Sequence, residues 1–379
     1  MSLKKNFSLM TTGRGLYVVC QWLLLVTIAR LADAEALGRF TYALALTSPI
    51  IIFTQFNMRA YMATDTGGEF RFVDYRLARL LGVAASLVVI AGLALIGGDD
   101  SVTLWVVLLV ALYKGFESIS DVHYGVMQKH ERFRPFALSL VWRGALSVTS
   151  LAVALALTGS IIAGVAAVAV AWLGLLLIFD MPAAGRARRG AGDTEGGLGS
   201  AWPAIVACFP FGITLALMSL RINVPVYFIE ARLGVDQVGY YSAVAYFIVA
   251  GRLVTGSLVQ TSSPRLARLF NSGDLAAYRQ LLVKLVGVAL VLAVAGVAGA
   301  WLLGEWVLRL AYGAEYGAYA RLLLLIMLAA GVGYFAQLTG MCLTVARYRR
   351  MLIVSNLLGT AAVAALAARL VPTMQLEGG

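Results

Sequence analysis

The sequence contains little charge. Only 13% of its 379 residues are Asp, Glu, Lys or Arg, whereas 61% are hydrophobic, and the mean hydropathy is +0.85. This composition excludes a soluble domain of that length. Only helices and closed barrels satisfy their backbone hydrogen bonds in lipid, and the apolar runs here reach about 20 residues, the length at which a helix crosses a bilayer. We therefore predict an all-α polytopic membrane protein.

Histidine and cysteine are scarce as well. The two histidines, His123 and His130, have neither the spacing of metal ligands nor a Ser or Cys partner pattern. Cys20, Cys208 and Cys342 stand far apart in apolar segments, where free buried thiols are expected. The sequence has no phosphate-binding loop of the ATPase type. It predicts no catalytic residue, metal or cofactor, and therefore a protein that is not an enzyme.

Basic residues exceed acidic ones, and the formal net charge is +11. A nucleic-acid-binding protein would also be basic, but here the basic residues gather in loops between apolar segments, as membrane topology requires. The predicted even-numbered loops are basic, for example at Arg71, Arg76 and Arg79, whereas the odd-numbered loops are short and mixed or acidic, for example at Asp99 and Asp100. This alternation predicts a cytoplasmic N-terminus.

Eleven spans divide into two predicted bundles. They cover residues 10–31, 37–58, 77–97, 102–127, 135–158, 161–180, 203–229, 237–262, 280–303, 318–344 and 350–371. We assign 1–180 to an N-terminal bundle of six helices, 181–202 to a flexible cytoplasmic linker rich in Gly, Ala and Arg, and 203–379 to a C-terminal bundle of five.

Weak internal matches predict that the two bundles are repeats about an axis along the membrane normal. In the same order in both halves, Ala29-Arg30-Leu31 matches Ala231-Arg232-Leu233, and Arg132-Phe133-Arg134 matches Arg347-Tyr348-Arg349. The repeat predicts two pseudo-symmetric six-helix bundles. A twelfth helix would begin near residue 376, so the second bundle is expected to be truncated and to lack its last helix.

The fourth span carries charges at bilayer depth. Lys114, Glu117 and Asp121 share one helical face, and ionisable groups at that depth usually face a protein-lined pathway. One alternative is that Lys114 and Glu117 form an ordinary intrahelical ion pair. As a hypothesis, Glu117 and Asp121 hold Lys114 and take part in proton or sodium coupling.

Further cations lie in other spans. Arg14 and Arg143 lie near span ends, where the alternative is that they extend to the cytoplasmic interface. Arg221 and Arg252 are deeper and have no obvious acidic partner in the sequence. Together with Lys114 they predict a cationic cavity that suits an anionic passenger carrying phosphate or pyrophosphate.

Two stretches carry a family resemblance. The opening GLYVVCQWLLLVTIARLADAEALGRFTYALALTSPI and the fourth span LYKGFESISDVHYGVMQKHERFR resemble bacterial polysaccharide (O-antigen) flippases, and the resemblance runs from about residue 6 to 371. Multidrug and toxin extrusion (MATE) carriers belong to the same superfamily of multidrug, oligosaccharidyl-lipid and polysaccharide exporters. The resemblance implies a MATE-like fold of two bundles around a cleft that opens alternately to each side of the bacterial inner membrane.

The resemblance also implies a passenger and partners. The expected passenger is an oligosaccharide on undecaprenyl pyrophosphate, exported for O-antigen of lipopolysaccharide, capsule or exopolysaccharide. Membrane lipids, a polysaccharide polymerase and a chain-length regulator are the further expected partners, and no nucleic acid is. Two alternatives remain open: a cation-coupled drug antiporter, in whose cleft acidic residues would dominate, and a non-transporting scaffold of a glycan-assembly complex.

Overall fold

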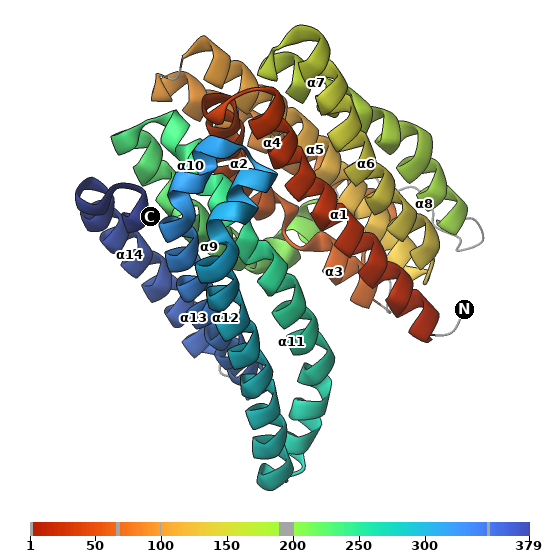
Figure 1. Cartoon of the computed structure of the whole chain (residues 1–379). Coiled ribbons are helices and arrows are strands. Elements are labelled where there is room, and N and C mark those ends of the chain that lie inside the picture. The colour runs from red at the N-terminus through yellow and green to blue at the C-terminus, as the bar shows by residue number, and fades with distance from the viewer. Residues whose placement is uncertain (1–2, 66–68, 99, 189–200, 347–348) are drawn as a thin grey trace. The chain divides into compact units, whose positions relative to one another are not determined.

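The computed structural model describes residues 3–65, 69–98, 100–188, 201–346 and 349–379 (Figure 1). In these ranges nearly every residue is helical and no strand occurs, and eleven helical segments are long and apolar enough to cross a membrane. The predicted all-α architecture with eleven spans is confirmed. The helices form two compact units, Met1–Asn223 (unit 1) and Val224–Gly379 (unit 2).

Among its described residues, unit 1 contains eight helices, one π-helical turn and the first part of a ninth helix. They are α1 (Leu3–Leu31), α2 (Ala34–Gln55), α3 (Met58–Thr64), α4 (Phe72–Gly97), α5 (Ser101–Lys129), α6 (Phe133–Thr158), α7 (Ile161–Leu175), the π-helical turn η1 (Leu176–Asp180), α8 (Met181–Arg188) and α9 (Ala201–Leu233).

Several helix ends in unit 1 follow from local sequence. Asp33 precedes α2 and accepts the Ala36 amide at 2.7 Å, and Asp100 precedes α5 and accepts the Thr103 amide at 2.9 Å. After α6 the chain turns at Gly159, whose φ of 63° suits a residue without a Cβ. These caps place the ends of the spans close to where the hydropathy pattern predicts them.

The second span bends near its end. α2 stops at Gln55, and the next two residues, Phe56 and Asn57, take left-handed φ values of 49° and 53° that non-glycine residues seldom adopt. α3 then continues the span beyond the predicted limit at residue 58, so that the apolar segment runs to Ala63. The bend places Arg59 in the first turn of α3, which packs against α5.

The sixth span differs from the prediction at its end. The chain stays helical through η1 and α8 to Arg188, and Ala183 and Ala184 are buried in the hydrophobic core of unit 1. The first part of the predicted linker 181–202 is therefore a packed helix, because alanines that bury against α5 favour helix over coil. Residues 189–200 of that linker lie outside the described residues.

α5 is the central helix of unit 1, since it packs against α2, α3, α4, α7 and α8, while α1 lies along α6 (Figure 1). Small residues allow close approach at these contacts. A Cβ added to Gly82 of α4 would lie 2.9 Å from the backbone oxygen of Thr54 in α2. One turn further along α4, the Ser86 hydroxyl lies 2.7 Å from the hydroxyl of Thr54.

The boundary between the units falls inside α9, where the sequence predicted a division at the linker. The first part of α9 packs with unit 1: Cys208 shares a buried cluster with Met58 and Tyr75, and Gly212 lies against the backbone oxygen of Phe53. Burial of this helical segment explains why the compact units divide after Asn223.

Unit 2 contains the rest of α9 and five further helices. These elements are α10 (Val235–Ala245), α11 (Phe247–Asn271), α12 (Leu275–Ala311), the 3₁₀ turn η3 (Ala314–Tyr319), α13 (Ala320–Val345), α14 (Arg349–Met374) and the turn η4 (Gln375–Gly378). α13 packs against α11 and α12. In the fold of unit 2, Thr255 of α11 donates a hydrogen bond to Gln337 of α13 at 2.8 Å.

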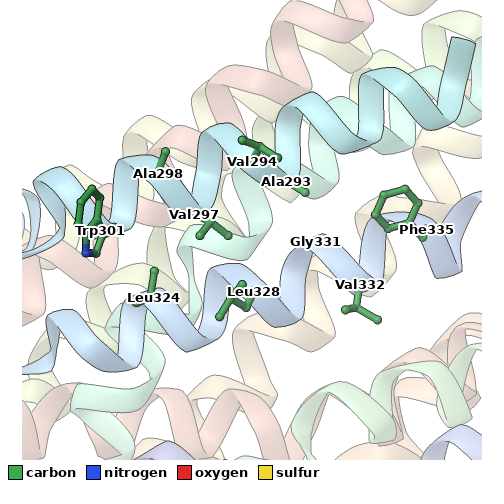
Figure 2. A pocket seen from close by; sticks show the side chains of 10 residues that line it. All are labelled: Ala293, Val294, Val297, Ala298, Trp301, Leu324, Leu328, Gly331, Val332 and Phe335. Atoms are coloured by element: carbon green, nitrogen blue, oxygen red, sulfur yellow. The ribbon is translucent and has the colours of Figure 1, made fainter.

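A groove runs between α12 and α13 (Figure 2). It has a volume of about 590 Å³ and is lined by ten residues, nine with hydrophobic side chains and one glycine, with Trp301 near one end and Phe335 near the other. None of the predicted site residues lines it. The groove suits contact with lipid chains and offers no group that could hold an anion.

Candidate functional site

The ionisable residues of α5 form two groups of ionic contacts in unit 1. One is a pair between Lys114 and Glu117, and the other is a cluster around Asp121. Lys114 Nζ lies 2.8 Å from Glu117 Oε2, and the Tyr17 hydroxyl of α1 donates to Glu117 Oε1 at 2.9 Å. This confirms the alternative that Lys114 and Glu117 pair within the helix. Both side chains stay partly accessible, at 22% and 26% exposure, so the pair is open to exchange with another ion.

Two aromatic rings lie near the Lys114 ammonium group. Its Nζ lies 5.8 Å from the ring centroid of Tyr113 and 5.9 Å from that of Trp172 in α7. The Trp172 indole is itself fixed, because its Nε1 donates to the Ser147 hydroxyl at 2.8 Å. The ring therefore holds the ammonium in one place while Glu117 neutralises it.

Asp121, one turn further along α5, bridges two arginines. Its Oδ1 lies 3.0 Å from Arg59 Nε and its Oδ2 lies 3.3 Å from Arg79 Nη2. Arg79 is 0% exposed and also donates to the Ser118 hydroxyl at 3.1 Å. The prediction that Arg79 lies in a cytoplasmic loop is wrong, because α4 begins at Phe72 and carries Arg79 into the core.

Arg14 of α1 lies beside this cluster. It is exposed, and it is close enough to Arg59 and Asp121 for their charges to act on it. The cluster thus gathers three guanidinium groups around one carboxylate.

Arg143 and Asp180 form a second, fully buried ion pair. Arg143 Nη2 lies 3.0 Å from Asp180 Oδ2, with side-chain exposures of 1% and 0%. Ser139 donates to Asp180 Oδ1 at 2.5 Å, and the Tyr124 hydroxyl, 2.6 Å from Ser139, lies 3.5 Å from Asp180 Oδ2. Burial excludes the alternative that Arg143 extends to the interface, and in this structure its guanidinium joins α6 to η1. Its predicted contact with a passenger stays a prediction.

Arg221 and Arg252 lie on other helices, α9 and α11. Arg221 is half-buried on α9 in unit 1. Arg252 is exposed on α11 in unit 2, where its charge acts on Tyr241 and Tyr334. Their predicted role in binding stays a prediction.

The ion pairs and clusters of unit 1 carry a surplus of positive charge. We call them the inner ion network, which consists of Arg14, Arg59, Arg79, Lys114, Arg143, Glu117, Asp121 and Asp180. Five cations face three carboxylates, so the network has an excess of two positive charges. An anionic group with two negative charges would balance it.

Three members of the network were missed in the sequence. Arg59 and Arg79 looked like loop residues, and Asp180 looked like the last residue of a span. The spacing of Tyr75, Arg79 and Ser86, one and two helical turns apart, was a clue that they share a face of α4. In the structure all three are buried. Asp180 had the clue of ending an otherwise wholly apolar run.

The fold is that of a class of membrane transporters. The lipid II flippase MurJ in an inward closed conformation superposes with a TM-score of 0.76, over 98% of this chain and 83% of the flippase, at 10% identity. An inward-facing multidrug resistance MATE family transporter of the MOP superfamily superposes with a TM-score of 0.72, over 96% of this chain and 88% of the transporter, at 11% identity. The protein is thus a multi-pass membrane protein with the MATE- and MurJ-like transporter fold.

A sequence relative narrows the class. The capsular polysaccharide biosynthesis protein CapF of Staphylococcus aureus is 26% identical over 328 residues, which is 86% of this chain and 81% of the relative. No family model matches the sequence. The chain is a homologue of this capsular polysaccharide biosynthesis protein, and the resemblance predicted from sequence is confirmed.

Proposed function

We propose that the protein is a flippase for lipid-linked oligosaccharides in the synthesis of a surface polysaccharide. The observation that carries the proposal is the positive surplus of the inner ion network in a chain with a transporter fold. The relative's role in capsule synthesis and the lipid II flippase of similar fold support a passenger on a lipid pyrophosphate. We place the protein in the bacterial inner membrane with a cytoplasmic N-terminus, as its loop charges predict.

The passenger's pyrophosphate would interact with cations that remain accessible. Lys114 and Arg14 are partly or fully exposed, and Arg59 keeps 30% of its side chain open. Glu117 and Asp121 neutralise Lys114 and Arg59 until an anion arrives. These cations already have carboxylate partners before the passenger binds. An anionic passenger therefore replaces a carboxylate and does not remove a further cation from water.

These existing ion pairs also affect how Glu117 and Asp121 could couple transport to a proton or a sodium ion. Each carboxylate of the network already contacts a Lys or Arg, so a coupling cation would have to compete with that partner. Release of Glu117 or Asp121 by an arriving anion would free a carboxylate for that role until a neighbouring cation receives it. Coupling by these two residues is therefore proposed as a step that follows passenger binding. Arg221 and Arg252 are proposed as further contacts for the saccharide or its phosphates.

A drug antiporter has the same fold. The two surplus positive charges of the network would repel a cationic drug, so binding of such a drug is disfavoured. A scaffold without transport activity would retain function when the charges of the network are changed. The experiment below separates this alternative from transport.

Lys114→Ala should abolish transport of a fluorescent polyprenyl-pyrophosphate saccharide in proteoliposomes, and export of surface polysaccharide in cells. Protein level and membrane insertion should be unchanged. The matched control is Arg309→Ala, which removes an exposed cation of an i,i+4 pair with Glu305 in unit 2. Normal transport by Lys114→Ala would refute the assignment, and export that survives without transport in vitro would favour the scaffold.

A further inference from the structure

Arg143 has hydrogen-bonding capacity that its surroundings leave unused. Among the described residues, its buried Nε and Nη1 atoms have no hydrogen-bond partner, although Nη2 binds Asp180. A guanidinium carries five N–H donors and stays charged in a protein, and buried donors are normally satisfied. The guanidinium carbon lies 4.7 Å from the ring centroid of Trp172 and 5.6 Å from that of Tyr124.

A second carboxylate lies within electrostatic reach of this guanidinium. The Trp172 ring lies between the two groups: its centroid is 4.7 Å from the Arg143 guanidinium and 5.9 Å from Lys114 Nζ, which itself lies 2.8 Å from Glu117 Oε2. Glu117 is occupied by Lys114 and Tyr17 in this structure. Arg143 therefore stands next to an acid that it does not yet hold, with unused donors.

We propose that Arg143 is a positioning residue that receives the Glu117 carboxylate when an anionic group of the passenger takes Lys114. The proposal rests on the proposed function, since it requires an anion at Lys114. Before binding, Lys114 pairs with Glu117 and Arg143 pairs with Asp180. After binding, Lys114 pairs with the anion, and Arg143 holds both Glu117 and Asp180.

In this exchange each of the four side chains keeps a contact with a group of opposite charge, and the single positive charge of Arg143 is shared by two carboxylates. Without Arg143, the displaced Glu117 would be left beside the anion, and like charges at close range oppose binding. Arg143 removes that competition because its Nε and Nη1 atoms donate to no other partner among the described residues. Since Asp180 anchors Arg143 to η1, the exchange also links the passenger to the end of the sixth span.

The test is a binding cycle on the full chain in nanodiscs, with a polyprenyl pyrophosphate as the probe and calorimetry as the readout. Arg143→Met is combined with Asp180→Asn, so that the buried cation and its counter-ion are removed together and no uncompensated charge remains. This double variant is measured with Glu117 present and with Glu117→Gln. All variants are first checked for unchanged thermal unfolding.

The double variant should bind the probe about 10- to 100-fold more weakly, the factor that corresponds to losing a hydrogen bond to a charged group. In the Glu117→Gln background, the same double change should alter affinity less than about threefold, because no displaced carboxylate then needs a partner. A purely structural role for Arg143 predicts an equal loss in both backgrounds, which would overturn the proposal.

Arg143→Lys provides a second route if the double variant folds poorly. It keeps a cation beside Asp180 but lacks the guanidinium's additional donors, so it should weaken binding in the same Glu117-dependent way. A loss independent of Glu117 would again overturn the proposal. If the wild-type chain does not bind the probe at all, the proposed function fails and the exchange fails with it. Binding without dependence on Glu117 overturns the exchange alone.

Discussion

Asp180→Asn should destabilise the protein far more than an ordinary loss of one ion pair. Asn has nearly the same volume as Asp, so the packing of η1 is preserved, but the Arg143 cation loses its counter-ion. Arg143 is 1% exposed and stays charged, because a guanidinium does not deprotonate in a protein. Breaking a buried pair in this way costs about 3–5 kcal/mol.

The magnitude follows from where the charge is left. Asp180 accepts from Arg143 and Ser139 and lies within 3.5 Å of the Tyr124 hydroxyl. In the variant, an amide carbonyl still accepts hydrogen bonds, so the loss is mainly electrostatic. Adding Arg143→Met to Asp180→Asn should recover most of the stability, since the unpaired cation is then gone.

The assay is equilibrium unfolding in mixed micelles with increasing SDS, followed by tryptophan fluorescence. The control is Glu305→Gln, which breaks the pair with Arg309 whose side chains are 59% and 58% exposed. That change should cost less than about 1 kcal/mol. If Asp180→Asn costs no more than Glu305→Gln, the Arg143–Asp180 pair is not the buried, dry pair described here.

Two further changes test helix contacts. Gly82→Val should cost about 1–3 kcal/mol in the same unfolding assay, because even its Cβ would lie 2.9 Å from the backbone oxygen of Thr54, and Gly92→Val, with nothing within 4 Å, should be tolerated. Asp100→Ala should cost about 1 kcal/mol by removing the α5 cap. Hydrogen bonds from Thr103, and then the charge of Arg39, lower the pKa of Asp100. The stability that Asp100 contributes is therefore present above its unfolded pKa of about 3.9 and is lost as the pH falls through the lower folded-state pKa. Asp100→Asn should remove this pH dependence of stability. Its persistence in the variant would contradict the argument.

Much of the fold could be predicted from the sequence. Eleven spans follow from apolar length, and the ends of α2 and α5 follow from Asp33 and Asp100 before them. The Lys114–Glu117 pair was also within reach, because three residues of a helix bring two side chains together whatever surrounds them.

The other ion pairs of the site could not be predicted from the sequence, because the residues that form them are far apart along the chain. Arg79 and Asp121 are 42 residues apart, and Arg143 and Asp180 are 37 apart. Periodicity shows which face of a helix a residue occupies, and it does not show which helix that face meets. The interpretation of Arg79 as a loop residue failed for this reason, since a basic residue near a span end looks the same whether it meets water or a carboxylate.

The sequence by itself determined that this is a helical membrane protein with a charged fourth span, because apolar length and helical spacing are local properties of the chain. The tertiary structure decided how those charges are used. Packing of α4, α6 and η1 around α5 pairs Asp121 with Arg79, and it places Arg143, with its unused donors, at the same Trp172 ring as Lys114 of the Lys114–Glu117 pair. The cost of a charge in a membrane depends on its neighbours in space, so the balance of the inner ion network exists only once the helices are assembled.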